Sequence, residues 1–223
     1  MALGSVLALG VLLGMRHATD ADHVIAVTTL VSRATSTRRA LSIGALWGLG
    51  HTLTVLLVGG AIIGFELVIP PHLGLLLEFL VALMLIALGV LNLRSRHKHQ
   101  HHHPNDQAEP APARSPIGSL FVGMVHGLAG SAALALLVLT TIQEPLWAIV
   151  YLLIFGAGSI LGMVVLTALM ALPLWMASRR FGSFEQTLTR VTGVVSVVFG
   201  LFLVYQIGFV DGLFGPDPSW SAK

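Results

Sequence analysis

One short stretch gathers most of the ionisable residues found in the apolar segments: Arg16-His17-Ala18-Thr19-Asp20-Ala21-Asp22-His23. On an ideal helix, at about 100° per residue, His17, Asp20 and His23 share an arc of about 120°, so two imidazoles and a carboxylate can converge. Asp22 lies outside this arc, where it could orient an imidazole N–H, unless the helix breaks here. The chain has no cysteine. Imidazole with carboxylate and without sulfur suits divalent first-row metals such as Ni, Co, Zn or Fe.

Two further histidines stand in apolar sequence and could complete a metal site. His51 lies in a glycine-rich stretch, and His126 occupies a place in the second half of the chain that resembles that of His17. A lone histidine in a membrane span can instead donate a hydrogen bond to another helix, and this alternative stays open for both. Glu78, an acid in apolar sequence, has no partner that the sequence positions. The candidate metal ligands are therefore His17, Asp20, Asp22, His23, His51 and His126.

The elements that carry these residues are strongly apolar. Of 223 residues, 55% are hydrophobic and 10% are charged, with a formal net charge of +2. A soluble domain carries about 25% charged residues, because its surface must face water. The composition therefore predicts an integral membrane protein and argues against a cytosolic enzyme, a nucleic-acid binder or a disordered chain.

The apolar segments predict an all-α membrane protein with about six transmembrane helices, since a span needs about 20 apolar residues. The first segment is longer than one span requires and contains the charged stretch, which predicts a break or a strong tilt there. The six segments are residues 2–31, 40–65, 73–93, 117–142, 146–176 and 187–210.

A hydrophilic linker, residues 94–116, separates the first three spans from the last three, and residues 211–223 form a short tail. The linker contains five histidines between residues 97 and 103. Such a tract can bind divalent metal, and its alternative is a low-complexity linker without that function.

Basic residues mark alternate connectors, which predicts the orientation of the chain. The second and fourth connectors contain no Lys or Arg. The positive-inside rule places the linker and the other basic connectors in the cytoplasm, and both termini outside, in a multi-pass protein of the cytoplasmic (inner) membrane. The basic residues are Arg33, Arg38 and Arg39 in the first connector, Arg94, Arg96, Lys98 and Arg114 in the third, and Arg179, Arg180 and Arg190 around the fifth.

The two halves of the chain, residues 1–93 and 117–210, resemble each other. Gly14-Met15-Arg16-His17-Ala18 corresponds to Gly123-Met124-Val125-His126-Gly127, and two later matches keep an offset of about 110 residues. Three spans per copy is an odd number, so the copies must have opposite orientations. This predicts two inverted three-helix repeats, which recur in transporters with the substrate site near mid-membrane. The alternative is two copies of a generic apolar three-helix pattern.

Three motifs resemble those of the nickel/cobalt transporter (NicO, NiCoT) superfamily. Residues 16–23 resemble its signature RHAxDADH, with all seven of the specified positions present. Leu49-Gly50-His51-Thr52 resembles a second motif, a Gly-His-Ser/Thr in the next span. Residues 126–133 resemble the HGLxGSAA motif of the shorter six-span members, which include membrane proteins associated with urease.

The resemblance implies a permease for Ni²⁺ or Co²⁺, in which His17, Asp22 and His23 recognise the metal and His51 supports them. The metal is then the cargo, and no resident cofactor is required. The implied partners are the ion, the lipid bilayer and nickel-enzyme or urease maturation proteins. Uptake is favoured over efflux, although the histidine-rich linker is typical of the exporters.

Other functions stay open on the sequence. A membrane accessory protein that binds metal and a metalloenzyme are alternatives from other classes. His99, His102 and His103 match an HxxHH pattern of membrane di-iron enzymes, but a tract of histidines produces such matches by chance. The sequence contains no GxxxxGK[ST] loop, which excludes a nucleotide-driven pump within this chain. The expected function is secondary transport without enzymatic activity.

Overall fold

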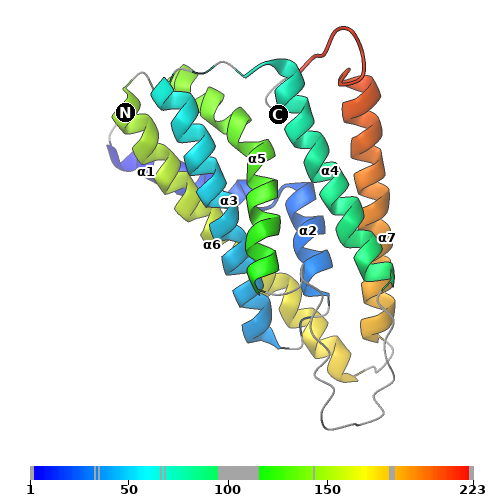
Figure 1. The fold of residues 1–223 in the computed structure, drawn as a ribbon. Coiled ribbons are helices and arrows are strands. Elements are labelled where there is room, and N and C mark those ends of the chain that lie inside the picture. Colours follow the sequence, from blue (N-terminus) through cyan, green and yellow to red (C-terminus); the bar gives the residue numbers. More distant parts are fainter. Residues whose placement is uncertain are drawn as a thin grey trace.

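The computed structural model is helical throughout the spans that it describes (Figure 1). It describes residues 3–32, 34, 36–65, 67, 69–94, 116–142, 144–180 and 184–220. The helices are α1 (Leu3–His17), α2 (Ala21–Val31), α3 (Thr37–Phe65), α4 (Pro71–Arg94), α5 (Pro116–Thr141), α6 (Pro145–Arg180) and α7 (Phe184–Tyr205), with a π-helical turn at Gln206–Val210. The predicted all-α membrane class is confirmed. The histidine tract at 97–103 lies outside the described residues.

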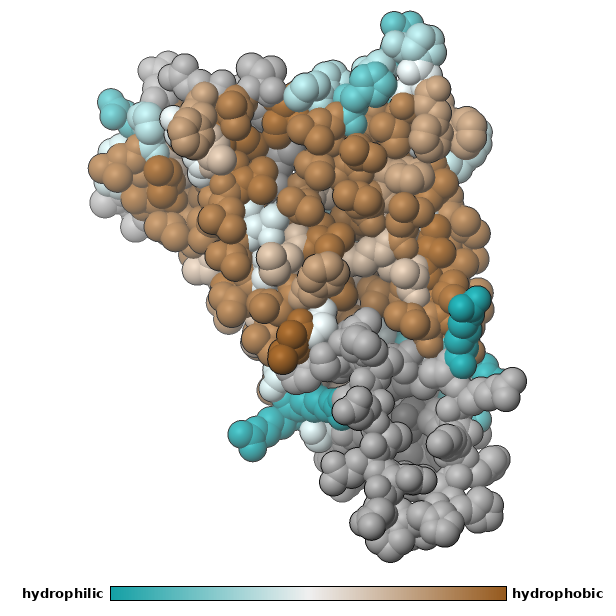
Figure 2. All heavy atoms as spheres, in the orientation of Figure 1, coloured by the Kyte–Doolittle hydropathy of each residue, from teal (hydrophilic) through white to brown (hydrophobic). Residues whose placement is uncertain are grey.

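The expected spans correspond to these helices, and the first is divided in two. α1 and α2 together take the place of the segment 2–31, with the predicted break between them. Within the described residues, four helices are long and apolar enough to cross a membrane: Thr37–Phe65, Pro71–Arg94, Pro145–Leu172 and Gln186–Val210. Apolar residues cover most of the visible face between two polar ends (Figure 2). A continuous apolar surface of this kind suits lipid and not water.

Proline sets the beginning of three helices. α4, α5 and α6 begin at Pro71, Pro116 and Pro145. Proline is favoured at the first helical position because its ring presets φ and its missing N–H would have no helical partner there. These starts therefore lie within a few residues of the expected ones.

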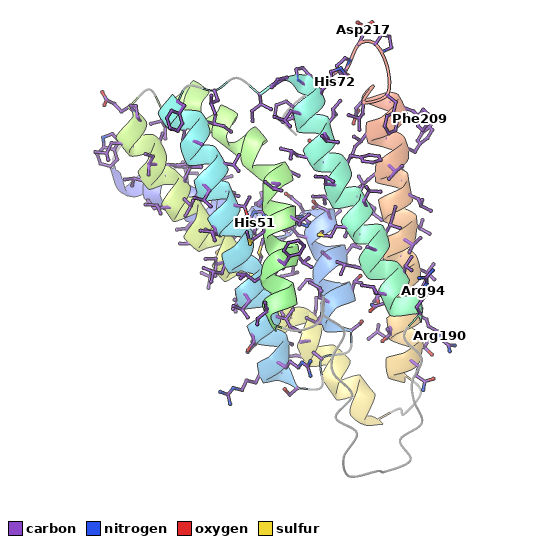
Figure 3. All side chains as sticks on the ribbon, viewed as in Figure 1. His51, His72, Arg94, Arg190, Phe209 and Asp217 are labelled. Carbon is purple, nitrogen blue, oxygen red and sulfur yellow. The ribbon has the colours of Figure 1, made fainter. Side chains whose placement is uncertain are left out.

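Corresponding helices of the two halves run in opposite directions. α3, α5 and α7 run upward in Figure 1, and α2, α4 and α6 run downward. The ends are chemically distinct: His72 and Asp217 lie at one end of the bundle, and Arg94 and Arg190 lie at the other (Figure 3). The second half therefore repeats the down–up–down order of the first half in inverted form.

The contacts between helices follow the same correspondence, in which α1, α3 and α4 of the first half match α5, α6 and α7 of the second. The packing of α3 on α5 is matched by the packing of α6 on α1, and the contacts α3–α6 and α4–α7 each join two corresponding helices. Gly14 lies against the backbone carbonyl of Phe155, and Gly123 lies against that of Trp47. The two glycines are separated by about 110 residues, and so are the two residues whose carbonyls they meet, as the repeat requires. A side chain on either glycine would overlap the facing backbone, so glycine lets these helices approach closely.

A buried amide ties the lower end of α2 to its neighbours. Asn92 of α4 is 2% exposed, and its Nδ2 donates to the Thr29 carbonyl at 3.0 Å and to Ser32 Oγ at 3.2 Å. Thr29 and Ser32 lie at the end of α2, just before the first basic connector. Such bonds between helices hold α2 in the bundle although it is only 11 residues long.

The segment after α7 folds back onto α4. Trp220 Nε1 donates to Glu78 Oε1 at 2.9 Å, and the indole packs with Leu75 and Ile207. Gly74 lies against the ring and leaves room for it. Glu78, for which the sequence positioned no partner, is therefore held by the tail and belongs to neither group of possible metal ligands among the described residues.

Candidate metal centre

The site forms where the first span breaks. α1 ends at His17 and α2 begins at Ala21, and the three residues between them turn the chain. The N–H groups of Thr19 and Asp20 bond the carbonyls of Arg16 and His17 at 2.8 and 3.1 Å, which closes the last turn of α1. Asp20 then adopts an extended backbone conformation and precedes the first residue of α2. The expectation of a break is confirmed, and the arc drawn on a continuous helix does not apply.

The break brings three histidines together. One ring nitrogen from each of His17, His23 and His51 lies within 4.8 Å of the other two. The ring centroids of His17 and His23 are 4.5 Å apart, and that of His51 is 5.2 and 5.3 Å from them. His51 comes from the middle of α3 (Figure 3), so this cluster lies near the centre of the bundle. Three imidazoles at this spacing can hold one transition-metal ion.

Two aspartates orient two of these imidazoles. Asp20 Oδ2 lies 2.9 Å from His17 Nδ1, and Asp22 Oδ1 lies 3.1 Å from His23 Nδ1. The Nε2 atoms of both histidines are buried and have no hydrogen-bond partner in the described part of the chain. A carboxylate on one ring nitrogen sets the tautomer and leaves the other nitrogen to bind metal, as in many metal sites. Around His17, His23 and His51 the carboxylates position the imidazole ligands. The side chain of Asp20 is 53% exposed and belongs to neither group of possible ligands among the described residues.

His126 joins the cluster from the second half of the chain. Its Nε2 lies 3.0 Å from Asp22 Oδ2, and its ring centroid is 4.1 Å from that of His23. Asp22, His23 and His126 each offer one ligand atom within 4.8 Å of the others. The structure therefore brings all six predicted residues into one cluster, as two triads that share His23 and with Asp20 at its edge.

One residue at the site escaped the sequence analysis. Trp47 is fully buried, and its ring centroid lies 5.5 Å from that of His23 and 5.7 Å from that of His126. Its indole N–H has no hydrogen-bond partner among the described residues. Its position four residues before His51 places both on one face of α3, and this spacing was the available signal.

The cluster leaves several buried nitrogens unsatisfied. Both ring nitrogens of His51 and Nδ1 of His126 are buried and lack hydrogen-bond partners within the described residues. Burying a polar atom without a partner costs about 1–3 kcal/mol, so such atoms usually gather where they bind something. Imidazole nitrogens grouped within 4.8 Å of one another are suited to a cation.

Comparison with known proteins decides the family. A family model described as sulfite exporter TauE/SafE matches residues 1–150, about two thirds of the chain. This chain belongs to the TauE/SafE family. Over 217 residues this TauE/SafE-family protein is 38% identical to the urease accessory protein UreH of Bacillus sp. (strain TB-90), covering 94% of the chain and 95% of the relative. No solved structure is significantly similar to it. The chain is therefore a membrane transporter of this family.

The family match corrects one expectation. Membership of the nickel/cobalt transporter superfamily, inferred from three short motifs, is wrong, because a family model over 150 residues assigns the chain elsewhere. The sequence of residues 16–23 reflects the site itself, a helix break that carries histidines and carboxylates. Similar site chemistry recurs on different frameworks, so a short motif identifies a site more readily than a family.

Proposed function

We propose that this TauE/SafE-family transporter moves a divalent first-row metal ion, Ni²⁺ or Co²⁺, across the cytoplasmic membrane. The observation that carries the proposal is the triad of His17, His23 and His51. Carboxylates hold two of its imidazoles, whose Nε2 atoms have no hydrogen-bond partner in the described part of the chain. Neutral imidazoles bind these ions well, and the metal is the cargo, not a resident cofactor.

The charge of the site favours a cation over an anion such as sulfite. Asp22 places a carboxylate within 3.1 Å of two imidazole nitrogens, and Asp20 places a second one beside His17. An anion entering the cluster would meet these carboxylates in surroundings that screen charge weakly. A divalent cation would be attracted by them.

The curated relative supports nickel as the cargo. It is named a urease accessory protein, and the resemblance of residues 126–133 to a motif of urease-associated nickel/cobalt carriers points to the same ion. We therefore propose uptake, which would supply nickel to urease maturation proteins in the cytoplasm. The end of the bundle that carries Arg94 and Arg190 would face the cytoplasm, following the positive-inside rule, and both termini would lie outside.

Accumulation of ⁶³Ni in cells that express the protein tests this function. Wild type should raise accumulation, and His17→Ala and His23→Ala should abolish the rise. His72→Ala is the matched control, because His72 is exposed at the beginning of α4 and far from the cluster along the bundle axis. Lower accumulation with wild type would establish efflux. Equal accumulation in all strains would refute metal transport, and sulfite release would then be measured with the same variants.

A further inference from the structure

We propose that the transporter has a second station for the ion, formed by Asp22, His23 and His126, next to the station formed by His17, His23 and His51. This inference rests on the proposed function, because it adds a step to the path of the same ion. In it, the ion moves from three imidazoles to a carboxylate and two imidazoles.

The second station has the spacing of a metal site. Ligand atoms of Asp22, His23 and His126 lie within 4.8 Å of one another, the same limit that the first triad meets. His23 and His126 are each 1% exposed, and Asp22 reaches both rings through its two carboxylate oxygens. Two imidazoles and one carboxylate form a ligand set that binds divalent first-row metals and leaves open coordination positions.

His23 belongs to both stations but can serve only one at a time. Its Nε2 has no hydrogen-bond partner among the residues that the structure describes, and its Nδ1 faces Asp22. A neutral imidazole has a single lone-pair nitrogen, since the other carries a proton. The two stations therefore cannot be filled together through His23, and the chain should bind one ion.

The second station joins the two halves of the chain. The ligands of the first station come from α1, α2 and α3, whereas His126 comes from α5. A movement of one repeat against the other would change the second station and leave the first intact. In transporters with inverted repeats, such movements expose the site alternately to the two sides. The ion would thus pass from one repeat to the interface of both.

Trp47 gives independent support. Its indole N–H, which has no partner within the described spans, belongs to a ring that is in contact with the rings of His23 and His126. An ion held by three protein groups keeps water in its open positions. The oxygen of such a water would give the buried N–H the acceptor that the described protein atoms do not provide.

The test compares equilibrium binding with transport in the full-length protein. Binding of Ni²⁺ is measured by calorimetry in lipid nanodiscs, and ⁶³Ni transport is measured in cells. His126→Gln keeps an amide donor for Asp22 but supplies a poor metal ligand. It should reduce transport about ten-fold or more while equilibrium affinity changes by about three-fold or less, whereas His51→Gln should weaken binding about ten-fold or more. Wild type should bind one ion per chain.

The outcomes separate this inference from the proposed function. Wild type that neither binds nor transports Ni²⁺ would overturn both. If wild type transports Ni²⁺ and the His126→Gln variant transports it equally well, only the second station is overturned. A His126→Gln variant that loses affinity as strongly as His51→Gln would show a single site, and two ions per chain would contradict the sharing of His23. If His126→Gln does not fold, Trp47→Phe replaces it, with slower transport at unchanged affinity expected and unchanged transport counting against the station.

Discussion

Asp22 Oδ2 in α2 lies 3.0 Å from His126 Nε2 in α5, and this contact joins the two halves of the chain inside the candidate site. The other oxygen of the same carboxylate bonds the backbone N–H of His23 at 2.9 Å and lies 3.1 Å from its Nδ1. One carboxylate therefore orients imidazoles from both repeats. A charged group in a span is costly and is usually retained where it pairs with others at a functional site.

Replacing Asp22 should damage the site more than replacing Asp20. Asp22→Asn removes the charged acceptor shared by His23 and His126, and we expect Ni²⁺ affinity and transport to fall about 10- to 100-fold. Asp20→Asn changes an exposed carboxylate whose ring contact is with His17, so we expect a smaller loss of affinity and transport. Calorimetric titration of the purified variants measures this. Equal losses for the two variants would contradict the geometry.

The glycine contacts should be intolerant of a single methyl group. Gly123→Ala places a Cβ against the backbone carbonyl of Trp47, which cannot move without shifting α3. Overpacking of this kind costs about 1–3 kcal/mol, and we expect a lower thermal unfolding temperature in detergent. Gly60→Ala is the control, because no atom of the described residues outside its own helix backbone and chain neighbours lies within 4 Å of its added Cβ. A destabilised Gly60→Ala beside an unaffected Gly123→Ala would disprove the packing.

The amide of Asn92 should stabilise the position of α2. Asn92→Leu keeps most of the volume and removes the donor to Thr29 and Ser32, and we expect a loss of about 0.6–2 kcal/mol. Thermal unfolding followed by circular dichroism provides the measurement. Leu93→Ala, on the exposed side of the same turn, should change the unfolding temperature little. A similar effect of both substitutions would remove the case for an anchoring amide.

The tail should stabilise the fold without taking part in metal binding. Trp220→Phe retains an aromatic ring to pack on Leu75 but loses the hydrogen bond to Glu78. We expect stability to fall by about 1–3 kcal/mol and Ni²⁺ affinity to stay unchanged. Trp147→Phe, at a residue 47% exposed near the start of α6, is the control. Weaker Ni²⁺ binding in Trp220→Phe would connect the tail to the site after all.

Much of the architecture follows from local sequence. The scarcity of charge indicates a membrane protein because each unpaired charge in lipid is expensive. Prolines at 71, 116 and 145 mark helix starts because proline is favoured at the first helical position. The break in the first span was predictable, since His17, Asp20, Asp22 and His23 interrupt an apolar segment too long for one crossing. Short motifs did not determine the family, because they carry the chemistry of a site and not the framework around it.

The residues that meet at the site were decided by tertiary structure. Sequence spacing relates His17 to His23 through the helix period, but it cannot bring His51 or His126 to them, because those distances depend on how α3 and α5 pack. The partner of Glu78 and the place of Trp47 depend on packing in the same way. The sequence determined which groups can bind a cation and that they stand in strongly apolar segments. Their division into two triads that share His23 arises only when glycines allow the backbones of the two halves to approach closely.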